Sequence, residues 1–401
     1  MILKYVIQNF YSFREESVVD FTVSPQAGFR PGLVETEAGH RLNTVIGVFG
    51  ANASGKTNLL KPLSFLSWFI IESARAKPGS ALLCEPFAFL PPTAFKPTII
   101  SLDFVHNAGE YRYELSVLKN RVLHEALLRK KTRFSYLFER TWNDEVQDYE
   151  FKSQDIGPSA HVPLRENASW LSSALLQEHE LALALRPFFD SFHCNLNFQG
   201  RMPTHDAEMV NMLRAAEFYG EQPEFLNSVS DLMAGFDLGL RKIHVEKTKS
   251  VTPDGKEVNF SLPLAVHHLD GVDYIRALYE ESRGTQALFV LLRHLLPVLQ
   301  SGGIAFIDEL ESGLHPHMVA AVIDLFFNPA TNPKGAQLIA TFHTDYLLRD
   351  KLHKYQIYFV EKDDRLNSTA YRLDSVKGVR NVDNIYEKYH AGAYGGIPSL
   401  P

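Results

Sequence analysis

Short apolar runs divide the chain into strands and helices. Three of them lack any polar alternation: "NTVIGVF", the run from Ile304 to Ile307, and "QLIAT" ending at Thr341. Runs of this kind are typical of parallel strands that are buried on both faces of a sheet. Leu and Phe then recur with helical spacing in "KTNLLKPLSFLSWFI", and an apolar helix runs toward Gln300. The pattern therefore predicts an α/β fold with central parallel strands.

The middle of the chain follows other patterns. "PTIISLDFVHNAGEYRYELSVLKNRVLHEALLRK" alternates like antiparallel strands with a turn at "NAGE", and the spacing becomes helical from about Ser169 to Met233. A hairpin is expected around Asp254-Gly255. Apolar heptads never persist for three or four repeats, so no long coiled coil is expected. We expect a mixed β-sheet core, an antiparallel β subdomain and a compact helical insertion. Residues 1–165 would supply the first buried strand and the antiparallel strands, residues 166–240 the helical insertion, and residues 241–401 the remaining buried strands of the core.

Length and composition restrict the class of protein. The 401 residues exceed the roughly 250–300 at which single cores stop growing, so two lobes or a large insertion are expected. Cys84 and Cys194 are far apart, which favours a reducing compartment over a disulfide or zinc framework. The start lacks a signal-peptide pattern and no window approaches 18 apolar residues, so we expect a soluble, cytoplasmic protein with no membrane contact. The net charge of −7 gives no general attraction to nucleic acid.

A glycine-bounded loop follows the first apolar strand. Gly50 and Gly55 bracket four residues before Lys56 and Thr57, the spacing of a loop whose backbone N–H groups surround phosphates. Lys56 would reach the β- and γ-phosphates, and the Thr57 hydroxyl would bind Mg²⁺. A chance glycine turn is the alternative, but strand, loop and helix stand in the order that the motif requires. The expected ATP-binding residues of this loop are Gly50, Asn52, Ser54, Gly55, Lys56, Thr57 and Asn58.

Two carboxylates follow the strand that ends at Ile307. Asp308 and Glu309 would emerge at the carboxyl edge of the sheet, where open α/β sheets bind ligands. Asp308 is placed to hold Mg²⁺ through water, and Glu309 to accept a proton from the attacking water. A carboxylate pair that only caps the next helix is the alternative.

Two more polar clusters stand at the ends of apolar elements. Ser282, Gly284 and Thr285 precede the helix toward Gln300, and His343 follows the strand that ends at Thr341. Each has an ordinary structural interpretation, as a helix N-cap and as a strand-end histidine. Their combination with the phosphate loop and the carboxylate pair favours phosphate binding by the first cluster and a γ-phosphate contact by His343.

Taken together, these motifs resemble those of ABC-type ATPase heads. "GANASGKT", "ESRGTQ", "FIDE", "ESGLHP" and "TFHTD" are similar to the motifs of the branch with SMC-like and RecF-like proteins, and "IQNFYSFREESVVDF" resembles its first strand and N-F-x-S-F element. "RENASWLSSAL" and "IYEKYHAGAYGGIP" resemble segments of prokaryotic AAA ATPases of anti-phage and abortive-infection systems, including the ATPase subunit of PARIS.

The resemblance implies that two heads sandwich ATP, with the signature of one facing the phosphate loop of the other. Ser282, Gly284 and Thr285 would then serve the ATP of the second subunit, in a homodimer or higher homo-oligomer. Two departures stand out. The signature reads S-R-G-T-Q instead of L-S-G-G-Q, which leaves its detailed contacts open, and no glutamine-loop residue is assigned.

Two functions follow from these expectations. In the first, Mg²⁺-dependent ATP hydrolysis gates an effector protein from the same operon, such as a nuclease or toxin, in anti-phage defence. In the second, the chain is a DNA repair or recombination ATPase that clamps DNA directly. The acidic balance and the missing coiled coil favour the first. A self-sufficient ATP-dependent nuclease would need a further catalytic domain, for which about 90 residues after Glu309 are too few.

Overall fold

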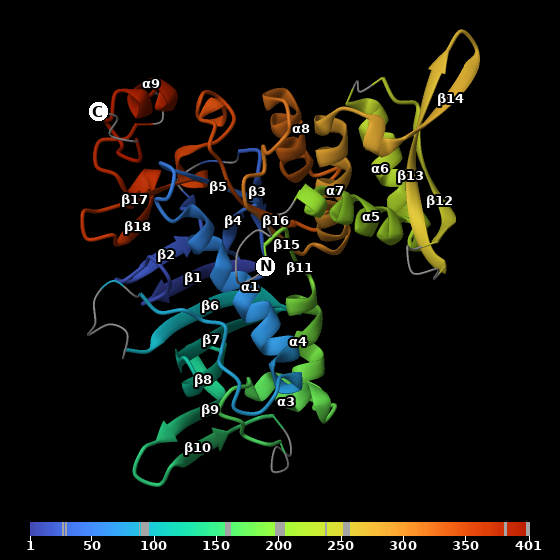
Figure 1. Ribbon diagram of the computed structural model, residues 1–401. Helices are drawn as coiled ribbons and strands as arrows, with labels where there is room; N and C mark the ends of the chain where they lie inside the picture. Colours follow the sequence, from blue (N-terminus) through green and yellow to red (C-terminus); the bar gives the residue numbers. More distant parts are fainter. Residues whose placement is uncertain are drawn as a thin grey trace.

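The chain folds around two β-sheets with a helix between them (Figure 1). The computed structural model describes residues 1–401 apart from 26–27, 29, 88, 90–95, 157–161, 197–204, 237–238, 252–256, 381–382 and 398–401. Helix α1 (Lys56–Glu72) lies between the two sheets and contacts strands or helices on both sides.

The first sheet is mixed. Five neighbouring strands run parallel and the sixth, at one edge, is antiparallel. Their order is β11 (Phe192–Cys194), β15 (Ile304–Ile307), β16 (Gln337–Thr341), β5 (Val45–Phe49), β17 (Ile357–Lys362) and β18 (Ser368–Arg372). Every residue of β5, β15 and β16 is buried, as the unbroken apolar runs predicted. The predicted mixed-sheet core is confirmed.

Both faces of this sheet are covered by apolar cores. Along β5, Ile46 and Val48 belong to the core around α1, whereas Val45 and Phe49 belong to the core on the opposite face. Successive side chains of a strand point to opposite faces, so a strand without polar residues can fill two cores at once. α7 (Arg283–Ser301) and α8 (Pro316–Phe327) line the second core.

The second sheet is antiparallel and has seven strands. Their order is β10 (Asp148–Ser153), β9 (Phe134–Asn143), β8 (Arg121–Lys130), β7 (Gly109–Leu118), β6 (Thr98–His106), β1 (Ile2–Gln8) and β2 (Ser17–Asp20). The predicted turn is present at Asn107 and Ala108, which both adopt positive φ. The alternation of apolar and polar residues thus predicted this subdomain correctly. A short ladder of β3 (Leu33–Glu35) and β4 (Arg41–Asn43) stands apart.

The helices expected between Ser169 and Met233 form two groups. α3 (Trp170–Leu176) and α4 (Glu180–Asp190) pack on α1, in the core beneath the antiparallel sheet. α5 (His205–Glu221) and α6 (Pro223–Gly235) pack on α7 and on a separate three-stranded sheet. β11 lies between the two groups in sequence and pairs with β15 at the edge of the six-stranded sheet. The helical segment is therefore interrupted by one strand of the central sheet.

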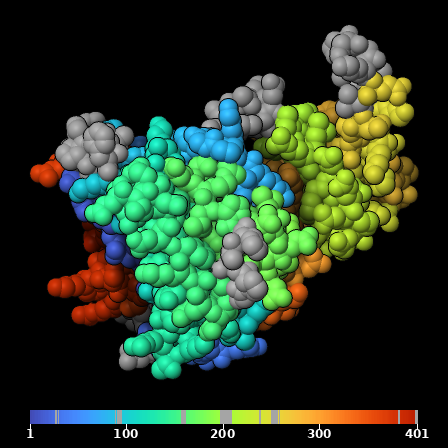
Figure 2. Space-filling model, turned by 90° about the horizontal axis from the view of Figure 1, so that it is seen from below, coloured from blue at the N-terminus to red at the C-terminus, as the bar shows by residue number. Residues whose placement is uncertain are grey.

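The three-stranded sheet consists of β12 (Lys242–Val251), β13 (Glu257–Leu269) and β14 (Val272–Ala277) in that order. β12 and β13 pair as the predicted hairpin, whose expected turn at Asp254-Gly255 lies outside the described residues. Together with α5 and α6 this sheet forms a projection on one side of the molecule (Figure 2). The domain boundaries at 165/166 and 240/241 remain predictions.

A buried ion pair joins the antiparallel sheet to α3. Glu125 and Arg140 are both fully buried, with 2.6 Å between Oε2 and Nη2. The Glu125 carboxylate also accepts hydrogen bonds from the Tyr113 hydroxyl at 2.8 Å, the Ser169 hydroxyl at 2.6 Å and the Trp170 backbone N–H at 2.9 Å. These hydrogen bonds offset much of the desolvation free energy that burying the two charges costs.

Removing one member of this pair should destabilise the fold strongly. Glu125→Ala leaves Arg140 buried without its carboxylate, which typically costs about 3–5 kcal/mol of unfolding free energy. Arg186→Ala breaks an exposed helical pair with Asp190 and should cost at most about 1 kcal/mol. Urea denaturation of both variants measures the difference, and equal midpoint shifts would contradict the role given to the buried pair.

Candidate nucleotide-binding site

The loop between β5 and α1 has a backbone that requires its two motif glycines. Gly50 has φ 148° and Gly55 has φ 114°, both in the region that favours glycine. A Cβ on Gly50 would collide with the backbone oxygen of Val360, and one on Gly55 would lie 2.7 Å from Ser12 Oγ. The loop is therefore pressed against β17 and the first β-hairpin, and the predicted glycine turn is present.

Hydroxyl groups from distant segments hold this loop in place. Ser368 Oγ donates to the backbone oxygen of Ser54 at 2.5 Å and lies 2.8 Å from Ser12 Oγ. Asn58 Nδ2 donates to Ser12 Oγ at 3.0 Å. Ser12 belongs to the N-F-x-S-F element, but Ser368 carries no sequence signal that would have revealed its role. Asn58 accordingly supports the loop from α1.

Lys56 lies over the loop. Its ammonium donates to the backbone oxygens of Gly50 at 2.8 Å and Ala51 at 3.1 Å. Burial lowers the pKa of Lys56 below its ordinary value, and the nearby carboxylates of Asp308, Glu311 and Glu309 offset part of this shift. The Lys56 ammonium thus lies between the loop and these three carboxylates. An anion bound beside it would further favour its charged form.

Asp308 is bonded by hydroxyls from two other elements. Thr57 Oγ1 donates to the Asp308 carboxylate, at 3.0 and 3.1 Å from its two oxygens, and Thr341 Oγ1 donates to Oδ1 at 2.7 Å. The carboxyl ends of β5, β15 and β16 therefore meet at one buried carboxylate. Thr57 and Asp308 offer the hard oxygen atoms that Mg²⁺ prefers, so the pair fits the predicted metal ligands.

Asn195 fixes the backbone at Asp308. Its side chain accepts from the Asp308 N–H at 2.8 Å and donates to the Asp308 carbonyl at 2.9 Å. Asn195 follows β11, the edge strand next to β15. No motif predicted this contact, because Asn195 lies in a stretch whose pattern predicted only helices.

Glu309 and His343 form the outer part of the site. His343 Nε2 lies 3.1 Å from Glu309 Oε1, and both side chains are more than one third exposed. Glu309 has φ 49°, a strained conformation for a residue with a side chain, and its N–H donates to Thr341 Oγ1 at 2.7 Å. Glu311, the first residue of the "ESGLHP" motif, had no predicted role of its own; it accepts hydrogen bonds from the N–H groups of His343 and Thr344. The structure thus brings the two predicted catalytic residues together.

The signature residues lie at the start of α7. Ser282 is the N-cap: its Oγ accepts from the Thr285 N–H at 3.2 Å and lies 2.8 Å from Thr285 Oγ1. Gly284 packs closely on the segment after Glu309, since a Cβ there would lie 3.1 Å from the Gly313 carbonyl. Among the described residues, no hydrogen bond links this cluster to the phosphate loop. The capping interpretation is correct, and the exposed Ser282 side chain still faces solvent.

Comparison with known proteins identifies the family. A family model described as "AAA domain, putative AbiEii toxin, Type IV TA system" matches residues 45–349, which is more than half of the chain. The chain therefore belongs to this family of AAA domains. The match begins at β5 and includes the phosphate loop, the signature cluster, Asp308-Glu309 and His343. No curated protein matches the chain.

Several solved structures are similar to the chain at low sequence identity. One is an Smc head bound to the C-winged helix domain of ScpA, with 13% identity, 94% of this chain and 99% of that chain covered, and a TM-score of 0.48. Another is the SMC head domain from Thermotoga maritima, with 14% identity, 92% and 98% coverage, and a TM-score of 0.41. A third is an Smc head with an extended coiled coil bound to the C-terminal domain of ScpA, derived from Pyrococcus furiosus, with 12% identity, 93% and 97% coverage, and a TM-score of 0.43.

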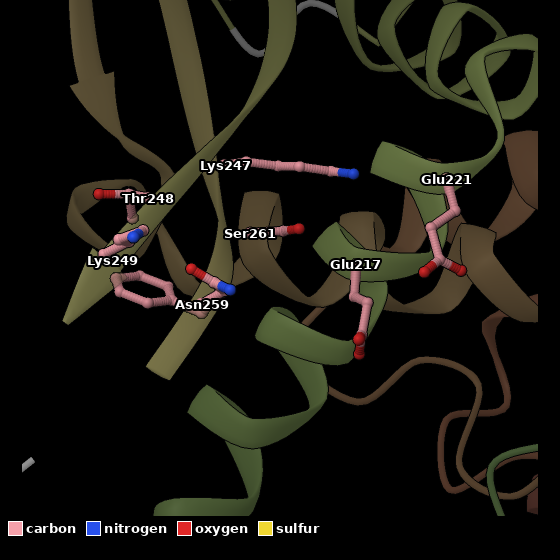
Figure 3. Close-up of a pocket in the computed structure, with 8 residues that line it drawn as sticks. Glu217, Glu221, Lys247, Thr248, Lys249, Asn259 and Ser261 are labelled. Atoms are coloured by element: carbon pink, nitrogen blue, oxygen red, sulfur yellow. The ribbon is translucent and has the colours of Figure 1, made fainter. Parts of the chain in front are cut away.

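A separate pocket lies between α5 and the three-stranded sheet (Figure 3). Its volume is about 460 Å³, and Glu217 and Glu221 of α5 stand opposite Lys247 and Lys249 of β12. None of the residues that line it belongs to the predicted nucleotide site. Acidic and basic groups are balanced in this pocket, so its walls favour neither a cation nor an anion.

Two features are absent from the described residues. None of the helices in the described ranges is both long and apolar enough to span a bilayer. Within the same ranges, no group of three or more His, Cys, Asp and Glu side chains is arranged to hold a metal. A metal held by Thr57 and Asp308 would need further oxygen ligands from water and a nucleotide.

Lys56 should reduce the stability of the nucleotide-free chain. Because its folded pKa lies below the unfolded value of 10.5, the unfolded state binds this proton more tightly. The penalty is present below the folded pKa of Lys56 and disappears as the pH rises toward 10.5. Lys56→Met should therefore raise the melting temperature at pH 7, and the gain should shrink toward pH 10.5. Lys249→Met, at an exposed lysine, is the control. A lower melting temperature for Lys56→Met at pH 7 would contradict this prediction.

Proposed function

We propose that the chain is a cytoplasmic, Mg²⁺-dependent ATPase whose nucleotide-driven dimerisation gates an effector protein in anti-phage defence. The main support for ATPase activity is the cluster at the carboxyl edge of the sheet. There the Thr57 and Thr341 hydroxyls both donate hydrogen bonds to the Asp308 carboxylate. Membership of the AAA family supports the same activity. The defence role rests on the description of the family and on the resemblance of the segments near residues 165–175 and 385–397.

Binding begins at the phosphate loop. The backbone N–H groups between Gly50 and Thr57 and the dipole of α1 would surround the phosphates, with Asn52 and Ser54 in the loop itself. Lys56 would exchange its two carbonyl contacts for phosphate oxygens. Thr57 and Asp308 would hold Mg²⁺, which when bound neutralises charge on the β- and γ-phosphates. Thr341 and Asn195 would keep Asp308 oriented.

Proton transfer would fall to Glu309. Its carboxylate is exposed enough to meet a water molecule and is held by its strained backbone and by His343. A carboxylate in this place can accept the proton of the attacking water, while His343 can contact the γ-phosphate or orient Glu309. Glu311 would position His343 through its backbone.

The signature would act on a second subunit. Ser282 is exposed and has no bond to its own phosphate loop, so its free N-terminal helix dipole can face the nucleotide of another copy. ATP would then favour the closed dimer, and a partner that binds one state better would be gained or released as ATP is hydrolysed. This arrangement would explain why, among the described residues, the Ser282 end of α7 makes no hydrogen bond with the phosphate loop of its own chain.

Glu309→Gln should separate binding from turnover. The amide keeps the size and polarity of the side chain but cannot accept a proton. Hydrolysis should fall roughly 10²–10⁴-fold while ATP stays bound and the dimer accumulates. Phosphate-release kinetics together with light scattering measure both effects. Turnover at the parental rate would show that Glu309 is not the base.

Mixing two inactive variants tests the shared site. Lys56→Ala should abolish ATP binding, and Ser282→Arg should block the signature sterically, so neither should hydrolyse ATP alone. Their heterodimer contains one interface with an intact loop and an intact signature, so activity should return on mixing. If heterodimers form without any recovered activity at every ratio, the site is not shared.

The proposed effector can be tested in cells that carry the whole operon. Pull-down of the chain should recover the product of a neighbouring gene, and the amount recovered should differ between the parent and Glu309→Gln, because the variant accumulates the ATP state. Lys56→Ala serves as the nucleotide-free control. Consistent absence of a protein partner, with DNA binding that persists at about 200 mM salt, would favour the DNA repair ATPase instead.

A further inference from the structure

β14 is an open sheet edge with an apolar surface. Among the residues that the structure describes, the order β12-β13-β14 leaves one side of β14 without a neighbouring strand, and Figure 1 shows the β13–β14 hairpin projecting from the molecule. Val272 is 52%, Tyr274 51% and Ile275 64% exposed. β10, at the edge of the large antiparallel sheet, instead exposes the charged side chains of "DYEFKS", a common protection against strand pairing.

The charged residues of β14 are already neutralised within the chain. Asp273 Oδ1 lies 2.8 Å from Arg241 Nη1 and 2.6 Å from His268 Nδ1. Arg276 Nε lies 3.3 Å from Glu280 Oε2. The edge therefore presents apolar side chains and free backbone groups, without a net charge that would repel another strand.

The hairpin geometry shows which backbone groups point outward. Leu269 pairs with Val272 across a two-residue turn whose residues, Asp270 and Gly271, have φ 50° and 82°. In such a turn the closing pair exchanges its own hydrogen bonds, and inward and outward groups then alternate along the strand. The N–H and C=O groups of Asp273, Ile275 and Ala277 consequently face the open side.

We infer that a second copy of this chain pairs with β14 in antiparallel fashion, about a two-fold axis at Ile275. Ile275 then faces Ile275 of the second copy, and Asp273 faces Ala277, so all outward backbone groups are paired. Tyr274 faces Arg276, twice by symmetry, which places a guanidinium beside an aromatic ring. A register centred on Tyr274 would pair fewer outward groups and set Val272 against Arg276.

This interface goes beyond the proposed ATP sandwich. It uses none of the nucleotide-site residues, so it forms without ATP and persists in Lys56→Ala. β14 leads through the short helix η3 (Leu278–Glu280) directly to the Ser282 cap, and His267 of β13 contacts Glu281 at 3.0 Å. The pairing therefore joins two chains next to their signature segments and links sandwich dimers into larger assemblies.

Sedimentation velocity of the nucleotide-free chain tests the pairing. The parent should be a dimer at micromolar concentration. Ile275→Pro removes only an outward N–H, which an edge strand tolerates, and should weaken the dimer at least about 30-fold by deleting two hydrogen bonds across the axis. Ile275→Lys should dissociate it by placing like charges opposite each other. Val146→Lys, at an equally exposed valine near β10, should leave it intact.

A cysteine pair tests the register. Ile275→Cys should form a disulfide-linked dimer on mild oxidation, because directly opposed residues lie within disulfide reach, whereas Tyr274→Cys should not. Burial raises the pKa of both native thiols, that of Cys84 to about 12 and that of Cys194 above its ordinary value, which keeps that background low. A monomeric parent, a dimer unaffected by Ile275→Pro, or equal linkage at both positions would overturn the proposal. A monomeric parent whose capture of an effector is abolished by Ile275→Pro would also overturn it, and would assign the edge to that effector.

Discussion

The site depends on one buried carboxylate. Asp308 receives hydrogen bonds from Thr57 at the start of α1 and from Thr341 at the end of β16, and Asn195 pairs with its backbone. These contacts join the ends of neighbouring parallel strands at a single point. A carboxylate at 4% exposure is costly unless it is well bonded, so each partner is restricted to one position. The phosphate loop, the Glu309 turn and the His343 segment are all placed relative to this group.

A strained backbone and two partly exposed side chains surround that buried carboxylate. Glu309 follows Asp308 in a left-handed backbone conformation that the bond to Thr341 maintains. Its side chain and that of His343 remain partly exposed. A buried, hydrogen-bonded carboxylate beside a more exposed glutamate and histidine suits a site that is completed by another molecule. The exposed Ser282 cap at the start of α7 is a suitable group to complete it.

The sequence was informative where function depends on local geometry. The glycine spacing at Gly50 and Gly55 predicted a loop whose positive φ values the structure contains, and the unbroken apolar runs predicted the buried parallel strands. Contacts between distant segments could not be predicted. Asn195 and Ser368 are single polar residues without a motif, and their value arises only from their position in the fold. The helical spacing of apolar residues likewise predicted the helices α3 to α6. It could not show that α3 and α4 belong to one core and α5 and α6 to the other.

The most direct test of this account is calorimetric titration of ATP into the intact chain and into Asp308→Asn, each with and without Mg²⁺. If Thr57 and Asp308 hold the metal, Mg²⁺ should strengthen ATP binding to the parent. In Asp308→Asn the metal-dependent gain should disappear, while metal-free ATP binding through Lys56 and the loop should remain. Equal ATP affinity of the parent with and without Mg²⁺, or an undiminished gain in Asp308→Asn, would contradict the central place given to this carboxylate.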